Sequence, residues 1–157
     1  MLKRVHLSNV KFEFENKYQK VEMKPKGLWY GINNSWIQWL EDNMPEWIPK
    51  KPIYYDIKID ESKILFIETQ KDVYNFSEEY GDPSEELRYG TFKSTTFINW
   101  PLVAERYSGI EVTEYYWNEC RFDNIWYNYW DCESGCIWKK NGILEIKEVK
   151  GYTTQVQ

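Results

Sequence analysis

The clearest structural pattern in the chain is the run GLWYGI at residues 27–32, followed almost at once by NSWIQWL at residues 34–40. The first run is short, apolar and bounded by glycines, as is typical of a buried strand. In the second run Asn34 or Ser35 is placed to cap a helix, the apolar residues share one broad face, and Pro45 ends the helix. The pattern therefore predicts a strand that leads directly into a short helix.

Outward from this segment, short strands are interrupted by short helices. Strands are predicted over residues 2–8, 10–14, 53–59, 63–68, 110–113, 135–138 and 143–149, and helices over 71–80 and from Asn99 to Gly109. Asn141-Gly142 is the best hairpin signal in the chain. Because the helices do not alternate regularly with the strands, the order favours an α+β fold over a doubly wound sheet.

Length and charge restrict the class of protein. A chain of 157 residues with 42% hydrophobic content predicts one globular domain over residues 1–157. No apolar run is long enough for a membrane span and the first residues do not form a signal core, so a cytoplasmic protein is expected. The net charge of −5 disfavours nucleic acid and anionic membranes as partners.

The cysteines favour a reducing compartment and argue against a metal site. Three cysteines (Cys120, Cys132 and Cys136) cannot all pair with one another, and a secreted framework is normally even in number and denser. With His6 as the only histidine and no companion to the pair at 132 and 136, no zinc site is expected.

The aromatic residues and a few polar ones are the remaining candidates for function. The chain holds nine tryptophans and thirteen tyrosines, too many for its core alone, so some rings are expected to line a cleft or a partner surface. No phosphate-cradling glycine loop is present, and a single histidine leaves little room for hydrolase triads. Three features remain: His6-Leu7-Ser8, the segment 27–39, and the late carboxylates Glu111, Glu114, Asp131 and Glu133.

In chain order these features resemble the ADP-ribosyltransferases of the diphtheria-toxin and poly-ADP-ribose-polymerase branch. That family has a histidine on its first strand, a strand of the type glycine-aromatic-aromatic-small before a serine-bearing helix, and an acid beside its last strands. The segment 55–64 also resembles the mid-chain strand and turn of small phage anti-CRISPR members. The resemblance implies a split, mostly antiparallel β-sheet with short flanking helices, in which strands starting near residues 2, 27 and 110 contribute to one cleft.

The resemblance also implies roles for single residues. His6 would hydrogen-bond the adenosine-side ribose of NAD, backbone groups near Ser8 would read the carboxamide, and Trp29 would stack on nicotinamide. Ser35 would lie close to the nicotinamide and Trp39 would close the pocket, while the strand residues Gly27 and Tyr30 belong to the same NAD-binding set. Asp131, or alternatively Glu111, would be the catalytic acid that stabilises the positive ribose.

The implied activity is mono-ADP-ribosylation of a protein or other macromolecular acceptor with NAD as substrate. For a phage-encoded protein this would serve anti-defence in the cytoplasm of the host. The alternative is a non-catalytic nucleotide-binding or protein-binding module that uses the same aromatic cleft, since exposed tryptophans suit an interface as well as a pocket. A purely structural protein, with Trp36, Trp39 and Leu40 as helix core and Ser35 as a cap, is a third hypothesis.

Overall fold

The computed structural model describes residues 2–83, 87–89 and 92–150. A seven-stranded sheet with the order β11-β4-β1-β3-β10-β9-β5 forms its centre. All neighbouring strands in it are antiparallel except β5 and β9, which are parallel. The strands are β1 (Arg4–Ser8), β3 (Leu28–Ile32), β4 (Ile53–Ile59), β5 (Ile64–Ile67), β9 (Gly109–Val112), β10 (Ser134–Ile137) and β11 (Ile143–Val149).

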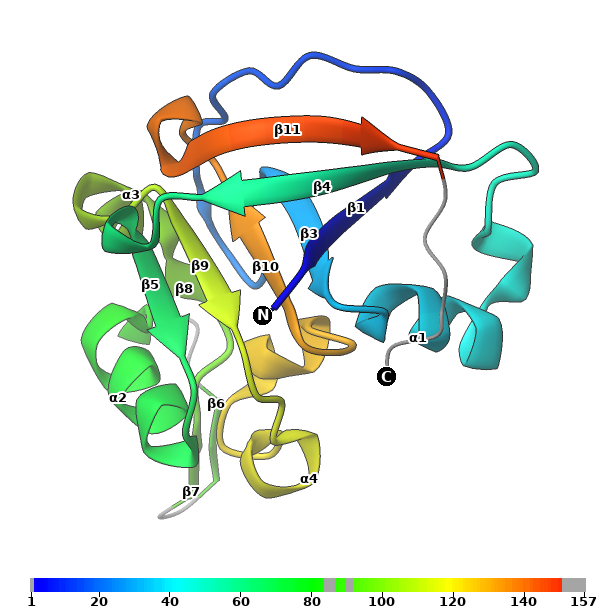
Figure 1. Cartoon of the computed structure of the whole chain (residues 1–157). Helices are drawn as coiled ribbons and strands as arrows, with labels where there is room; N and C mark the ends of the chain where they lie inside the picture. The colour runs from blue at the N-terminus through cyan, green and yellow to red at the C-terminus, as the bar shows by residue number, and fades with distance from the viewer. Residues whose placement is uncertain (1, 84–86, 90–91, 151–157) are drawn as a thin grey trace.

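The sheet is curled, and helices and two small ribbons flank it. In Figure 1, β11 and β4 run across the view, whereas β5 and β9 run down it and the antiparallel β10 runs up it. The ribbons pair β2 (Val21–Glu22) with β8 (Ile98–Asn99) and β6 (Leu87–Tyr89) with β7 (Phe92–Ser94). The helices are α1 (Ser35–Asn43), α2 (Gln70–Tyr80), α3 (Trp100–Arg106) and α4 (Trp117–Cys120), with 3-10 turns η1 (Pro45–Trp47), η2 (Glu61–Lys63), η4 (Ile125–Tyr129) and η5 (Lys140–Gly142). The α+β class and the mostly antiparallel sheet are thus confirmed.

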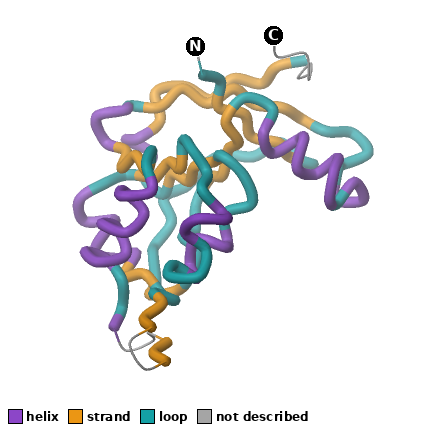
Figure 2. The backbone as a smooth tube through the Cα atoms, turned by 90° about the horizontal axis from the view of Figure 1, so that it is seen from below, coloured by secondary structure: helices purple, strands orange, loops and turns teal. Residues whose placement is uncertain are grey.

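Local sequence explains where α2 and α3 begin. The hydroxyl of Thr69 accepts a hydrogen bond from the backbone of Asp72, whose carboxylate in turn accepts from the backbone of Thr69, so α2 starts with a capping box. The side chain of Asn99 accepts from the backbone N–H of Leu102 and begins α3. α1 and η1 stand apart from the other helices, at the right of Figure 2.

Two hydrophobic clusters lie on the two faces of the curled sheet. The larger cluster joins β5, β9 and β10 to α2, α3 and η4, and four tryptophans in it (Trp100, Trp126, Trp130 and Trp138) are at most 1% exposed. The smaller cluster gathers aliphatic and tyrosine side chains of β3, β4 and β10. Part of the aromatic content is therefore core.

The pairing between β1 and β3 is short. Only Arg4 with Ile32 and Val5 with Gly31 are paired, although β1 continues along β4 as far as Ser8 and β3 continues along β10 as far as Leu28. Beyond Val5 the two strands separate while each keeps its other neighbour. The sheet opens between them.

Two predictions about elements are wrong. Residues 10–14 form no strand; Phe12 instead lays its ring edge-on against Tyr55 at 4.9 Å, so this extended segment covers the sheet without pairing. The Asn141-Gly142 hairpin does not form either, because the backbone of Asp60 donates to the carbonyl of Gly142 and the turn directs β11 toward β4 and away from β10.

Candidate functional site

A cavity of about 250 Å³ lies where β1 and β3 separate. Its walls come from β1, β3, α1, the segment between β2 and β3, and the loop that leads into β10 with the first residue of that strand. The lining residues are His6, Leu7, Lys24, Trp29, Tyr30, Trp36, Tyr129, Trp130, Asp131, Cys132 and Ser134. Thus His6, Trp29 and Asp131, which are far apart in the sequence, face one space. β9, which we expected to contribute, lines none of it.

Aromatic rings make up much of the wall. Trp29 and Trp130 meet edge to face with centroids 5.1 Å apart, which fixes the orientation of both rings. Trp36 stacks on Trp39 at 5.1 Å with an interplanar angle of 6°. The ammonium of Lys24 lies 4.5 Å from the centroid of Trp29, so this ring already holds a positive charge. A wall of this kind suits a flat or cationic ligand.

His6 is held as a neutral hydrogen-bond acceptor. Its Nδ1 lies 2.5 Å from the backbone carbonyl of Trp29, and a carbonyl only accepts, so Nδ1 carries the proton. Burial lowers the pKa of His6, and the bond to Trp29 only partly opposes this. The ring is therefore neutral at pH 7, and its Nε2, which bonds to none of the described residues, can accept a hydrogen bond from a ligand hydroxyl.

Asp131 is the carboxylate of the cavity. It lies three residues before Ser134, where β10 begins, and in the part of the chain that the structure describes its carboxylate has no hydrogen bond or ion pair. Partial burial raises its pKa, while the charge of Lys24 opposes that rise. Asp131 is thus an acceptor without a protein donor, facing a cavity lined by aromatic rings.

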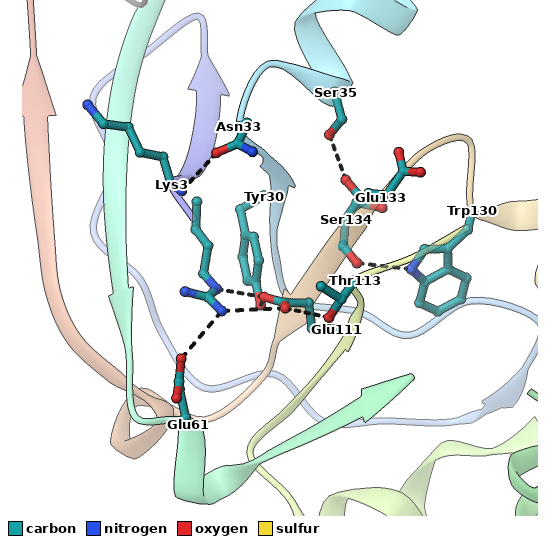
Figure 3. Close-up of polar contacts among 11 residues, drawn as sticks. Lys3, Tyr30, Asn33, Ser35, Glu61, Glu111, Thr113, Trp130, Glu133 and Ser134 are labelled. Carbon is teal, nitrogen blue, oxygen red and sulfur yellow. Dashed lines mark hydrogen bonds and ion pairs between the residues drawn. The ribbon is translucent and has the colours of Figure 1, made fainter. Parts of the chain in front are cut away.

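Glu111 lies elsewhere. It is fully buried in β9 and accepts hydrogen bonds from Arg4 Nε at 2.6 Å, from the Tyr30 hydroxyl at 2.9 Å and from the Thr113 hydroxyl at 2.8 Å (Figure 3). The ring of Tyr30 reaches it across Gly135, where an added Cβ would lie 2.4 Å from the Tyr30 hydroxyl. Glu111 therefore ties β1, β3 and β9 together and does not face the cavity, contrary to its candidacy as the catalytic acid.

Two other predicted site residues, Ser8 and Tyr30, lie beside the cavity and in its wall, respectively. Ser8 lines an adjoining groove of about 540 Å³, which shares Leu7 and Trp36 with the cavity and also holds Trp47 and Lys50. Tyr30 lines the cavity but directs its hydroxyl to Glu111.

Ser35, Trp39 and Gly27 lie outside the cavity. Ser35 is the first helical residue and does not cap α1; its hydroxyl donates to the carbonyl of Glu133 at 2.6 Å (Figure 3). Trp39 stacks on Trp36 but does not line the cavity, so Trp36 and not Trp39 closes it. Gly27 lies against β10, where an added Cβ would meet the carbonyl of Ile137 at 2.3 Å, and it serves packing.

Sequence reasoning missed several residues of the site: Leu7, Lys24, Trp36, Tyr129, Trp130, Cys132 and Ser134. The proximity of Trp130 to Asp131 along the chain was a usable signal, because neighbours of a candidate acid share its loop. Lys24 had none, since it lies in a stretch without periodicity.

The described residues contain neither a cluster of metal ligands nor a membrane-spanning helix. Among the described residues no three His, Cys, Asp or Glu side chains lie close enough together to hold a metal ion, and the three cysteines are buried and unpaired. No helix in the same ranges is long and apolar enough to cross a membrane. Comparison of the chain with protein-family models, with curated proteins and with solved structures gives no significant match.

Proposed function

We propose that this protein is an NAD-dependent mono-ADP-ribosyltransferase with an ADP-ribosyltransferase-like split sheet. The observation that carries the proposal is the cavity at the separation of β1 and β3. There a first-strand histidine, the aromatic strand and a late acid face one another, in the chain order of that family. Of the late carboxylates Glu111, Glu114, Asp131 and Glu133, only Asp131 lines this cavity.

The shape and chemistry of the cavity suit the nicotinamide end of NAD. A volume of about 250 Å³ is below that of pockets for whole drug-sized ligands, about 300–1,000 Å³, so it fits one end of a dinucleotide. The π-face of Trp29 attracts a cation, and the nicotinamide ring of NAD is a planar cation. The adjoining groove, continuous through Leu7 and Trp36, provides room for the adenosine half.

In the reaction the bond between C1′ of the ribose and the nicotinamide nitrogen breaks, and neutral nicotinamide leaves with the bonding electrons. The acceptor, or water in its absence, bonds to C1′ and loses a proton. Positive charge develops on the ribose before that bond is complete. The carboxylate of Asp131 stabilises this charge and accepts from a ribose hydroxyl, while His6 Nε2 accepts from the other ribose.

The test is release of nicotinamide from NAD by the purified protein. Asp131→Asn should still bind NAD but lower release by about a hundredfold or more, because its contact strengthens mainly in the transition state. Asp42→Asn, the same change on an exposed carboxylate of α1 outside the cavity, is the matched control and should turn over as the parent does. Equal release by the parent and Asp131→Asn would remove the chemical basis of the proposal.

A non-catalytic module is the second candidate, and the ammonium of Lys24 over Trp29 favours it specifically. That contact shows that the cavity wall can hold a cation without any chemistry. Quenching of tryptophan fluorescence by NAD, with no nicotinamide released by the parent, would support this candidate over the enzyme.

A further inference from the structure

The side chain of Lys24 occupies the ring face that the proposed function assigns to nicotinamide. Its ammonium lies 4.5 Å from the centroid of Trp29 and lines the cavity. Within the residues that the structure describes, this ammonium has no hydrogen bond and no ion pair. The direct contact of this ammonium is therefore with the ring of Trp29, and such a contact is weaker than a charge-assisted hydrogen bond to an anion.

The backbone around Lys24 is fixed on both sides, whereas its side chain is not. Before it, β2 pairs with β8, and Trp100 Nε1 donates to the carbonyl of Glu22 at 3.0 Å. After it, Gln19 bonds both the N–H and the carbonyl of Lys26, and Gly27 lies against β10. The segment thus holds the root of Lys24 at the cavity while its flexible four-carbon stem lets the ammonium turn.

We propose that Lys24 is a phosphate-binding residue that exchanges the ring of Trp29 for the diphosphate of NAD. This rests on the proposed function. Two cations cannot share one ring face, so entry of the nicotinamide cation displaces the ammonium. The same ligand brings two negative phosphates, to which a lysine offers three N–H donors.

The charges around the cavity remain balanced through this exchange. In the free protein Lys24 is the cation that opposes the rise in the pKa of Asp131. In the complex the nicotinamide cation takes that place beside Trp29. Asp131 therefore keeps a positive neighbour in both states, and Lys24 is free to serve the phosphates.

Two ligands separate the two roles of Lys24. NAD carries both the pyridinium and the phosphates, whereas the N-methylnicotinamide cation carries the pyridinium alone. Dissociation constants of both are measured by calorimetry for the parent, for Lys24→Met and for Lys26→Met. Lys26→Met is the control: it removes the same charge two residues along the chain, from a side chain that is exposed and does not line the cavity.

Lys24→Met should bind NAD about tenfold more weakly, as expected for a lost charge-assisted contact, with a flatter dependence on salt. It should bind N-methylnicotinamide at least as tightly as the parent, because the competing ammonium is gone. Lys26→Met should match the parent for both ligands.

Other outcomes overturn the inference. If the parent binds both ligands but Lys24→Met weakens both equally, or changes neither, Lys24 does not exchange partners and the proposed function stands without it. If the parent binds neither ligand, the proposed function and the inference fail together. Circular dichroism of Lys24→Met checks that the variant is folded.

Discussion

Replacing Glu111 by glutamine should destabilise the protein strongly and leave its chemistry intact. Glu111 is fully buried, and its two oxygens accept from Arg4, Tyr30 and Thr113. Glutamine removes the charge opposite Arg4 and turns one acceptor into a donor that faces other donors. Breaking a buried pair by removing one partner costs about 3–5 kcal/mol. We expect a value near the lower end, because Arg4 keeps 11% exposure and a second carboxylate, Glu61, at 3.7 Å.

Such a loss is a large part of the total stability of a small domain, about 5–15 kcal/mol. Urea unfolding followed by tryptophan fluorescence measures it. Asp131→Asn is the control: because the pKa of Asp131 is raised in the fold, its charge opposes folding, and neutralising it should leave the midpoint unchanged or slightly higher. We call the buried contacts of Glu111 with Arg4, Tyr30 and Thr113 the Glu111 clamp. A loss of stability below about 1 kcal/mol for Glu111→Gln would refute it. Loss of nicotinamide release by a folded Glu111→Gln would restore Glu111 as the acid.

Two further predictions concern packing and pH. Gly135→Ala places a Cβ 2.4 Å from the hydroxyl of buried Tyr30, so it should cost about 1–3 kcal/mol in urea unfolding, and an unchanged midpoint would show that the ring has room to shift. NAD binding should weaken as the pH falls below 6.5 through the lowered pKa of His6, because protonation of Nε2 removes an acceptor and adds a charge beside a cationic ligand. Measuring the affinity for NAD against pH in the Asp131→Asn background isolates the effect of His6. With His6→Gln added, the affinity should not change as the pH falls below 6.5. A pH dependence that survives His6→Gln would assign the effect to another group.

Local pattern was sufficient for the elements whose signals are contiguous in sequence. The strands predicted over 53–59 and 143–149 have those bounds in the structure, and the helix predicted over 71–80 begins one residue earlier, at Gln70. Which strands pair with one another could not be predicted in the same way. The Asn141-Gly142 turn has a hairpin composition, yet its contact with Asp60 directs β11 to β4. Pairing between distant strands depends on such tertiary contacts, which no local window contains.

The candidate site shows the same limit at the level of side chains. His6, Trp29 and Asp131 could be named because chain order placed them on elements that meet. Glu111 could not be separated from Asp131, since both are late acids beside strands and only burial distinguishes them. Lys24 was missed because a long side chain reaches its position from a segment with no periodic pattern.

The position of the Glu111 clamp explains why the sheet can open at the cavity without losing its order. Arg4 contributes to the clamp one residue before Val5, the last residue of β1 that pairs with β3. Tyr30 contributes from the strand on the other side of the opening, and both side chains end on one carboxylate. The two strands are therefore joined by buried charge-assisted contacts just where their backbone ladder ends. Beyond that point the two strands share no backbone ladder, although His6 Nδ1 donates to the backbone carbonyl of Trp29 across the opening. The contacts of Arg4 and Tyr30 with Glu111 at the end of the ladder, and the aromatic wall of the cavity beside it, make the separation of β1 and β3 a built feature of this fold.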